Sequence, residues 1–326
     1  MATGEQLKSL LRSYIEGDRD RFLTVSMQVA AHAARRGSTN LAKDLRELID
    51  EAKLHSEQPR SRPSVPFARP AGDLADLIAA SYPKTQLSDM VLAGPTRQSL
   101  QRVIVEYRQQ SKLRSHGLSA RRKLLLVGPP GSGKTMTAAA LAGELKLPLL
   151  AVQLDSLITK FLGESAAKLR QVFDAMSVTC GVYLFDEFDA IGGDRGRPNE
   201  VGEMRRVLNS FLQFLEADES DSLILAATNH LSILDVALFR RFDDVVRYGL
   251  PEPEQAEELI RSNLNTFDLH GVMWSEVRQA ANGLSYAEIA RACAEAAKGA
   301  VLADLDEVSA EGILTALHER SAIRQP

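Results

Sequence analysis

The sequence predicts an α/β fold: a mainly parallel sheet with helices on both faces, a C-terminal helical lid and a small N-terminal α-helical domain. Three observations support this prediction. Short apolar runs alternate with amphipathic helical segments between residues 73 and 250. A glycine-rich loop joins one of these runs to a helix-forming segment. After Pro251 only helical patterns follow, which indicates a separate helical subdomain.

The composition is that of an ordinary globular protein, with 44% apolar and 25% charged residues among 326. The net charge of −4 argues against a protein built mainly to coat nucleic acid. Cys180 and Cys293 stand in no metal-binding or redox spacing, which favours a reducing compartment. No apolar run reaches membrane-spanning length, and residues 1–6 lack a signal-peptide pattern. We therefore expect a cytoplasmic protein that does not bind membranes.

Residues 1–54 predict three short helices. In the first, one apolar face is formed by Leu7, Leu10, Leu11, Tyr14 and Ile15. One interpretation is a small bundle in which these helices pack on one another. The other is a docking module for a protein substrate or partner. The position of the segment beyond a linker favours the docking module.

Residues 55–72 predict that linker, because prolines and polar residues disfavour a helix and favour an extended chain. The linker also carries Arg60, Arg62 and Arg69, which can contact nucleic acid. No aromatic stacking pattern accompanies them, so a solvated tether is favoured.

Residues 73–250 form the predicted α/β domain. Its candidate strands cover residues 123–127, 149–154, 181–185, 223–227 and 245–250. Residues 251–326 form the predicted lid, with helices over 254–266, 274–281, 286–304 and 310–320.

The glycine-rich loop follows the apolar run 124–127 and precedes a helical segment that begins near Met136. Its spacing, G-x-x-x-x-G-K-[ST], is that of a phosphate-binding loop. Small residues allow backbone N–H groups to surround phosphate oxygens, and the helix N-terminus adds positive potential. Lys134 can reach the β- and γ-phosphates, and the Thr135 hydroxyl can ligate Mg²⁺. The predicted nucleotide-binding residues are Gly128, Pro129, Pro130, Gly131, Ser132, Gly133, Lys134, Thr135 and Met136.

Two further strands end in polar residues suited to ATP hydrolysis. The run 182–185 ends in Asp186, which can hold Mg²⁺, and Glu187, which can activate the attacking water. The run 223–227 leads to Asn229, whose amide can contact the γ-phosphate or that water, although asparagine is also a common turn residue. Strand-ending acids are often only surface groups, but the phosphate-binding loop upstream favours the catalytic interpretation.

Arg240 and Arg241 stand together ahead of Asp243 and Asp244. They can form surface ion pairs with these acids. Alternatively, they can reach the γ-phosphate of a neighbouring subunit as arginine fingers, which stabilise charge in the transition state.

In order and spacing, these motifs resemble those of the AAA ATPases, a group within the AAA+ superfamily. The resemblance covers about residues 74–305 and is nearest to the katanin and spastin branch, in a bacterial-type single-ring form. Residues 283–289 resemble the lid motif in which Gly-Tyr-Ser-Gly-Ala-Asp is common, with Tyr286 and Glu288 as departures. The resemblance implies a homo-oligomer, a hexamer, whose first pore loop corresponds to Lys160, Phe161, Leu162 and Gly163. Residues 192–199 correspond to the second pore loop.

The sequence therefore predicts an ATPase that uses ATP and Mg²⁺ to move pore loops and remodel or unfold protein substrates. It contains no His-Glu-x-x-His or Gly-x-Ser-x-Gly motif, so any proteolysis is expected from a separate protease or effector chain. The first alternative is an ATP-gated adaptor that switches a partner protein without threading it. A nucleic-acid motor is a weaker alternative, because the charge balance is acidic.

Overall fold

The computed structural model describes residues 72–157, 164–189, 198–230 and 239–323. The chain divides into two units, Met1–Pro66 and Phe67–Pro326, and all described residues belong to the second. The predicted N-terminal module (1–54), most of the linker (55–72) and the first pore loop (160–163) lie outside the described residues. Within the described part of the chain, no helix combines the length and apolarity needed to cross a membrane.

A six-stranded sheet with the order β1-β3-β4-β5-β2-β6 organises the α/β domain. All neighbouring strands are parallel except β1, which pairs antiparallel with β3. The strands are β1 (Ile78–Ser81), β2 (Lys123–Val127), β3 (Leu149–Val152), β4 (Val182–Phe185), β5 (Leu223–Thr228) and β6 (Asp244–Arg247). The parallel α/β fold is confirmed. The prediction missed β1, because an edge strand of four residues with only Ile78 buried carries no clear periodicity.

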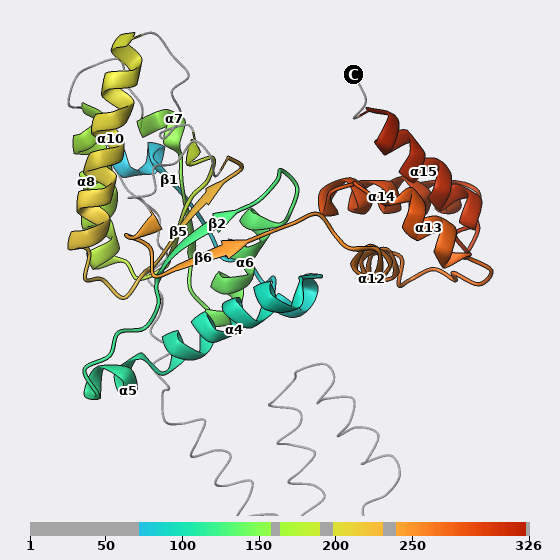
Figure 1. Cartoon of the computed structure of the whole chain (residues 1–326), viewed down its shortest axis with the longest axis horizontal. Coiled ribbons are helices and arrows are strands. Elements are labelled where there is room, and N and C mark those ends of the chain that lie inside the picture. Colours follow the sequence, from blue (N-terminus) through green and yellow to red (C-terminus); the bar gives the residue numbers. More distant parts are fainter. Residues whose placement is uncertain (1–71, 158–163, 190–197, 231–238, 324–326) are drawn as a thin grey trace, which may run out of the picture. The chain divides into compact units, whose positions relative to one another are not determined.

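Alternating strand residues separate two apolar layers, since successive side chains point to opposite faces of a sheet. Leu125 and Phe185 belong to one core, and Leu124 and Leu184 belong to the other. Figure 1 shows α8 and α10 on one side of the sheet and α4 and α6 on the other. The helices of this domain are η1 (Gly72–Asp76), η2 (Leu87–Asp89), α4 (Gly94–Arg108), α5 (Gln110–Ser115), α6 (Lys134–Leu145), α7 (Leu154–Leu157), α8 (Glu164–Val178) and α10 (Pro198–Ala217).

Two predicted boundaries in this domain are corrected. The strand predicted over 149–154 ends at Val152, because Leu154 already begins α7 and its side chain is buried there. The predicted second pore loop over 192–199 overlaps α10, which begins at Pro198. Proline suits the first turn of a helix, where its missing N–H would have no helical partner.

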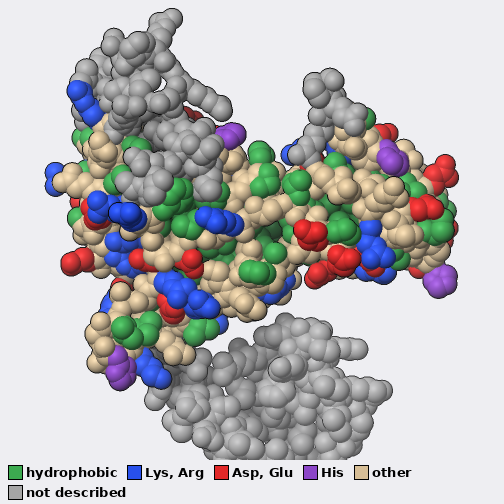
Figure 2. Space-filling model, viewed as in Figure 1, with side chains coloured by type: hydrophobic (Ala, Val, Ile, Leu, Met, Phe, Trp, Pro, Cys, Tyr) green, Lys and Arg blue, Asp and Glu red, His purple; other side chains and the backbone are tan. Residues whose placement is uncertain are grey.

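The lid has its own apolar core, centred on residues such as Ile260, Val277, Ile289 and Leu317. Its helices are α12 (Pro253–Asn263), α13 (Trp274–Ala280), α14 (Tyr286–Leu302) and α15 (Ala310–Ile323), close to the predicted ranges. On the face shown in Figure 2, acidic side chains gather over the lid, whereas Lys and Arg are more frequent over the α/β layers. An acidic surface disfavours contact between this face of the lid and nucleic acid.

Candidate functional site

The loop between β2 and α6 is shaped by glycines that other residues cannot replace without strain. Gly131 and Gly133 have φ values of 74° and 97°, in the left-handed region. Gly128 has no room for a side chain, since a Cβ there would lie 2.6 Å from the Cβ of Tyr248. A loop of this shape can present backbone N–H groups to an anion at the N-terminus of α6.

Lys134 begins α6, directly after this loop. Its Nζ donates to Gly128 O at 2.8 Å, to Pro129 O at 3.0 Å and to Asn229 Oδ1 at 2.8 Å. Burial lowers the pKa of the Lys134 ammonium, while Asp186 and Asp189 act in the opposite direction. The three acceptors are oxygen atoms, as phosphate acceptors are, so the position suits a cation that binds phosphate.

Thr135 and Asp186 form the predicted pair of magnesium ligands. Thr135 Oγ1 donates to Asp186 Oδ2 at 2.6 Å, which brings two hard oxygen donors together at the ends of β4 and the loop. Among the described residues no cluster of three or more His, Cys, Asp or Glu could hold a metal ion. This donor set fits Mg²⁺, which prefers oxygen and usually keeps several waters and phosphate oxygens as ligands.

Glu187 follows Asp186 in a strained backbone conformation. Its φ is 51°, and it is exposed at the site. A non-glycine residue in this region costs on the order of 1–3 kcal/mol and persists only when its surroundings enforce it. Phe188 supplies this constraint, because its N–H donates to Ala227 O at 2.8 Å and its ring packs 4.7 Å from that of Phe211. The arrangement holds the Glu187 carboxylate beside the phosphate-binding loop.

Asn229 is positioned by a carboxylate that the sequence analysis missed. Asp189 Oδ1 accepts from Thr228 Oγ1 at 3.1 Å and from Asn229 N at 3.3 Å. These bonds join the end of β5 to the turn after β4, and they set the backbone of Asn229 while its side chain accepts from Lys134. In the sequence Asp189 is visible as a third acid after β4. Its partners are about forty residues away, and only the pairing of the strands brings them within hydrogen-bond distance.

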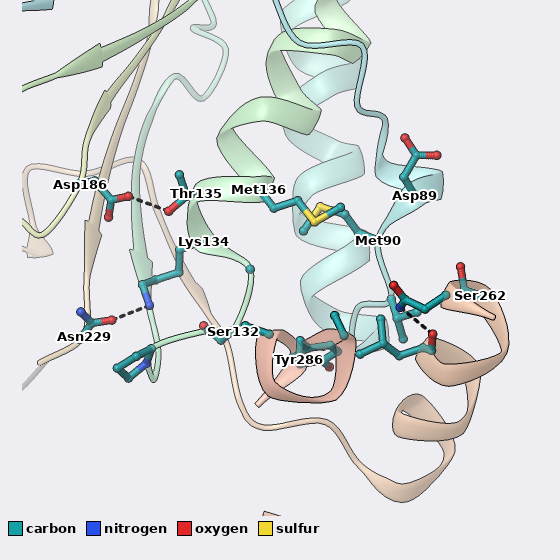
Figure 3. Close-up of a pocket in the computed structure, with 18 of the residues that line it drawn as sticks. Asp89, Met90, Ser132, Lys134, Thr135, Met136, Asp186, Asn229, Ser262 and Tyr286 are labelled. Atoms are coloured by element: carbon teal, nitrogen blue, oxygen red, sulfur yellow. Dashed lines mark hydrogen bonds between the residues drawn. The ribbon is translucent and has the colours of Figure 1, made fainter. Parts of the chain in front are cut away.

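A cavity of about 520 Å³ extends from these groups to the lid. That volume is within the range of nucleotide- and cofactor-sized sites. Figure 3 shows Lys134 turned toward Asn229 and Thr135 turned toward Asp186. The lining residues are Asp89, Met90, Val91, Pro130, Gly131, Ser132, Gly133, Lys134, Thr135, Met136, Asp186, Glu187, Asn229, Leu259, Ser262, Asn263, Tyr286, Ala287 and Ala290.

Most of the predicted nucleotide-site residues thus line this cavity, together with residues that were not predicted. Met90, Val91 and Leu259 were missed, and no motif in the sequence marks them. Gly128 and Pro129 are not among the described lining residues, but their carbonyl groups hold Lys134. Ser132 Oγ is buried and has no hydrogen-bond partner among the described residues, so it offers a polar group to a phosphate oxygen.

The two candidate arginine fingers lie apart from this cavity. Neither arginine is among the described residues that line it. Both arginines are exposed, and Arg241 forms an ion pair with Glu216 at the end of α10. The alternative prediction, ion pairs of these arginines with Asp243 and Asp244, is not what the structure has. Asp243 instead accepts from the backbone N–H groups of Arg122 and Lys123, and Asp244 accepts from the Ser99 hydroxyl.

A comparison with known proteins identifies the family. Residues 124–250 match the "ATPase family associated with various cellular activities (AAA)". The chain is 34% identical over 328 residues to the "Uncharacterized AAA family ATPase y4kL" of Sinorhizobium fredii, across 99% of this chain and 97% of that protein. This chain belongs to the AAA family of ATPases. The family predicted from the motifs is confirmed, and nucleotide binding is the property that the family carries.

Other relatives match only the AAA region. The "ATP-dependent zinc metalloprotease FtsH 1" of Methylacidiphilum infernorum is 34% identical over 231 residues, or 68% of this chain, and the match spans 36% of its own length. A crystal structure of the FIGL-1 AAA domain superposes with a TM-score of 0.61 at 22% identity, covering 76% of this chain and 86% of that one. This likeness confirms the AAA fold, and the placement near the katanin and spastin branch stays a prediction.

Proposed function

We propose that this AAA protein is an ATP-driven ring motor that remodels or unfolds protein substrates through a central pore. The observation that carries the proposal is the division of charged groups between two places. One cavity contains Lys134, the Thr135–Asp186 pair and Glu187, which together suit a magnesium-bound triphosphate and an attacking water. Arg240 is exposed and does not line that cavity, and in this proposal it completes the site of a neighbouring subunit.

In this proposal each residue has a separate task. Lys134 neutralises phosphate charge, and Thr135 with Asp186 would hold Mg²⁺, which supplies charge stabilisation at the phosphates. Glu187 accepts a proton from the attacking water, and Asn229 orients that water or the terminal phosphate. Arg240 of a neighbouring subunit stabilises the charge that develops at the transition state, with Arg241 held beside it by Glu216.

Head-to-tail contacts that close on themselves produce a ring, and the proposal takes this ring to be a hexamer. The residues proposed to grip a polypeptide are Phe161 and its neighbours in the first pore loop. The docking site for the substrate or partner is residues 1–54. The FtsH relatives carry the name of proteases, and a separate protease or effector chain is the corresponding partner in this proposal.

Mixing two inactive variants tests whether the site is shared between subunits. Arg240→Ala and Glu187→Gln should each abolish hydrolysis, because one removes the arginine and the other removes the proton acceptor. A mixed oligomer should recover part of the activity wherever an intact Arg240 meets an intact Glu187. Subunit exchange is first verified with differently labelled subunits. No recovery after verified exchange would show that Arg240 acts within its own chain or only structurally.

Phe161→Ala separates the motor from the ATP-gated adaptor. The substitution leaves the cavity residues intact, so oligomers should form with ATP and ATP should be hydrolysed. Remodelling should fail, because an alanine methyl cannot replace the contact area of an aromatic ring. The substrate is first captured by co-purification with Glu187→Gln, and its unfolding is then followed for both proteins. Normal remodelling by Phe161→Ala would favour the adaptor.

A further inference from the structure

Tyr286 is the feature of the cavity that departs most from the lid motif described above. It occupies the first position of α14, after the N-cap residue Ser285, at a place where that motif commonly has glycine. The first turn of α14 lies directly against the phosphate-binding loop. Ala287 N donates to Gly131 O at 3.1 Å, and a Cβ on Gly131 would lie 2.7 Å from Ser285 Oγ. Tyr286 is thus fixed next to the loop that would hold the phosphates.

The hydroxyl of Tyr286 is bound to the start of another lid helix. Tyr286 Oη donates to Gln255 Oε1 at 3.0 Å, and the same oxygen accepts from Glu252 N at 3.0 Å. Glu252 is the N-cap of α12 and the last residue of the connector between β6 and the lid, residues 248–252. Gln255 Oε1 therefore links Tyr286, in the wall of the cavity, to Glu252, in the connector that precedes the lid.

The tyrosine is also suited to act as a donor. Burial raises the pKa of the Tyr286 phenol, and the nearby Glu252 and Glu258 carboxylates add to the effect. The hydroxyl consequently keeps its proton at neutral pH. Gln255 Oε1 can only accept, which fixes the direction of the bond.

Tyr286 lines the cavity from the lid, apart from Lys134 and Asn229 (Figure 3). Leu259 and Ala290 line the same cavity from the lid, and Met90 lines it from the segment before α4. These neighbours are apolar, and an aromatic ring among them offers a flat surface to a base or ribose. Glycine at this position would contribute no such surface and no hydroxyl.

We propose that Tyr286 contacts the nucleoside part of the bound nucleotide and, through Gln255, couples occupancy of the cavity to the order of the connector 248–252. The proposal rests on the proposed function only in requiring that the cavity bind ATP. Tyr286 contacts the ligand through its ring, and Gln255 is a positioning residue. The ring contact and the coupling through the hydroxyl can be tested separately. Tyr286→Phe removes only the hydroxyl, whereas Tyr286→Ala removes the hydroxyl and the ring.

Calorimetric titration of the protein with ATP or ADP, in the presence of Mg²⁺, tests whether the Tyr286 ring contacts the nucleotide. Tyr286→Ala should raise the Kd of both nucleotides about tenfold, as loss of an aromatic contact to a base commonly does. Tyr286→Phe keeps the ring and should weaken binding less. The matched control is Tyr107→Phe, which removes a hydroxyl bonded to Cys180 away from the cavity lining and should bind normally. A wild-type Kd for Tyr286→Ala would overturn the contact.

Hydrogen exchange followed by mass spectrometry tests the coupling. In wild-type protein, ATP should slow amide exchange in the peptide covering residues 249–256, and Tyr286→Phe should lose most of this protection at saturating ATP. Gln255→Ala should show the same loss, and the double variant should lose no more than either single variant. Full protection in Tyr286→Phe would overturn the coupling. If wild-type protein fails to bind ATP, the proposed function fails; if it binds and the variants behave as wild type, only this inference fails.

Discussion

The two ends of the parallel strands differ in how completely their polar groups are satisfied. At the carboxyl ends lie the phosphate-binding loop, the strained Glu187 and the Ser132 hydroxyl, which has no hydrogen-bond partner in the described part of the chain. At the amino ends, Asp218 is buried and paired with Arg122, and it also accepts from Ser220 Oγ at 3.2 Å. The same sheet therefore has one end with groups left for a ligand and one end whose polar groups pair with one another.

Hydrogen bonds between side chains and the backbone also hold the amino end together. Asp243 Oδ2 accepts from the N–H groups of Arg122 and Lys123, both at 2.9 Å, and ties the segment after Arg241 to the start of β2. Because β2 carries the phosphate-binding loop at its other end, this strand connects the arginine segment with the nucleotide cavity. The comparison teaches that charge at the amino end stabilises the fold, whereas charge at the carboxyl end is available for chemistry.

Lys134→Ala should produce the largest effect on binding. Removing a cation that faces phosphate oxygens should weaken ATP affinity about a hundredfold, since a hydrogen bond between charged groups contributes roughly 1.5–3 kcal/mol and several are lost. The free energy of unfolding should change little by comparison. Calorimetric titration measures the affinity, with the exposed Lys112→Ala as control. Equal affinity of Lys134→Ala and wild type would contradict the assignment of the phosphate end.

Asp218→Ala should show the opposite pattern. Loss of a buried partner leaves Arg122 uncompensated and should lower the free energy of unfolding by about 3 kcal/mol, the lower end of the usual range because Arg122 keeps part of its exposure. ATP affinity should stay near the wild-type value. Urea denaturation measures the change. The control is Asp221→Ala, which breaks an exposed pair with Arg114 and should cost at most about 1 kcal/mol.

Asp189→Ala tests the carboxylate that positions Asn229. Without its two acceptor bonds, the end of β5 should loosen, and kcat should fall about tenfold while ATP affinity changes less. Asp189→Asn keeps an acceptor oxygen at the same place and should retain most of the activity. A steady-state ATPase assay measures kcat for both variants. Equal losses in both variants would show that the charge of Asp189 matters rather than its hydrogen bonds.

The smallest expected effect concerns pH. Burial lowers the pKa of Lys134, and bound phosphates would raise it again because they favour the charged ammonium. ATP affinity should therefore be constant below the pKa of Lys134 in the free protein and should fall as pH rises through it. Titrations across alkaline pH measure this decline. Lys134→Met cannot ionise and should lack it; the same slope in that variant would assign the effect to another group.

The sequence by itself determined the features that depend on local order. The loop from Gly128 to Thr135 is a contiguous motif, and apolar runs of the right length placed β2, β4 and β5 and the four lid helices. Asp186, Glu187 and Asn229 follow strands directly, so their meeting at one edge could be predicted from the rule that parallel strands end together. These inferences needed only spacing and the periodicity of side chains.

Only the tertiary structure decided the contacts between segments far apart in the chain. The bond from Asn229 N to Asp189, the pairing of Arg241 with Glu216 and the part of the cavity wall that Met90, Leu259 and Tyr286 form all depend on it. The sequence could not predict them, because strand order, register and the packing of α12 and α14 fix these distances, and many arrangements share the same local patterns. The physical reason is that local propensity acts within a few residues, whereas burial and hydrogen bonding select partners across the whole folded domain.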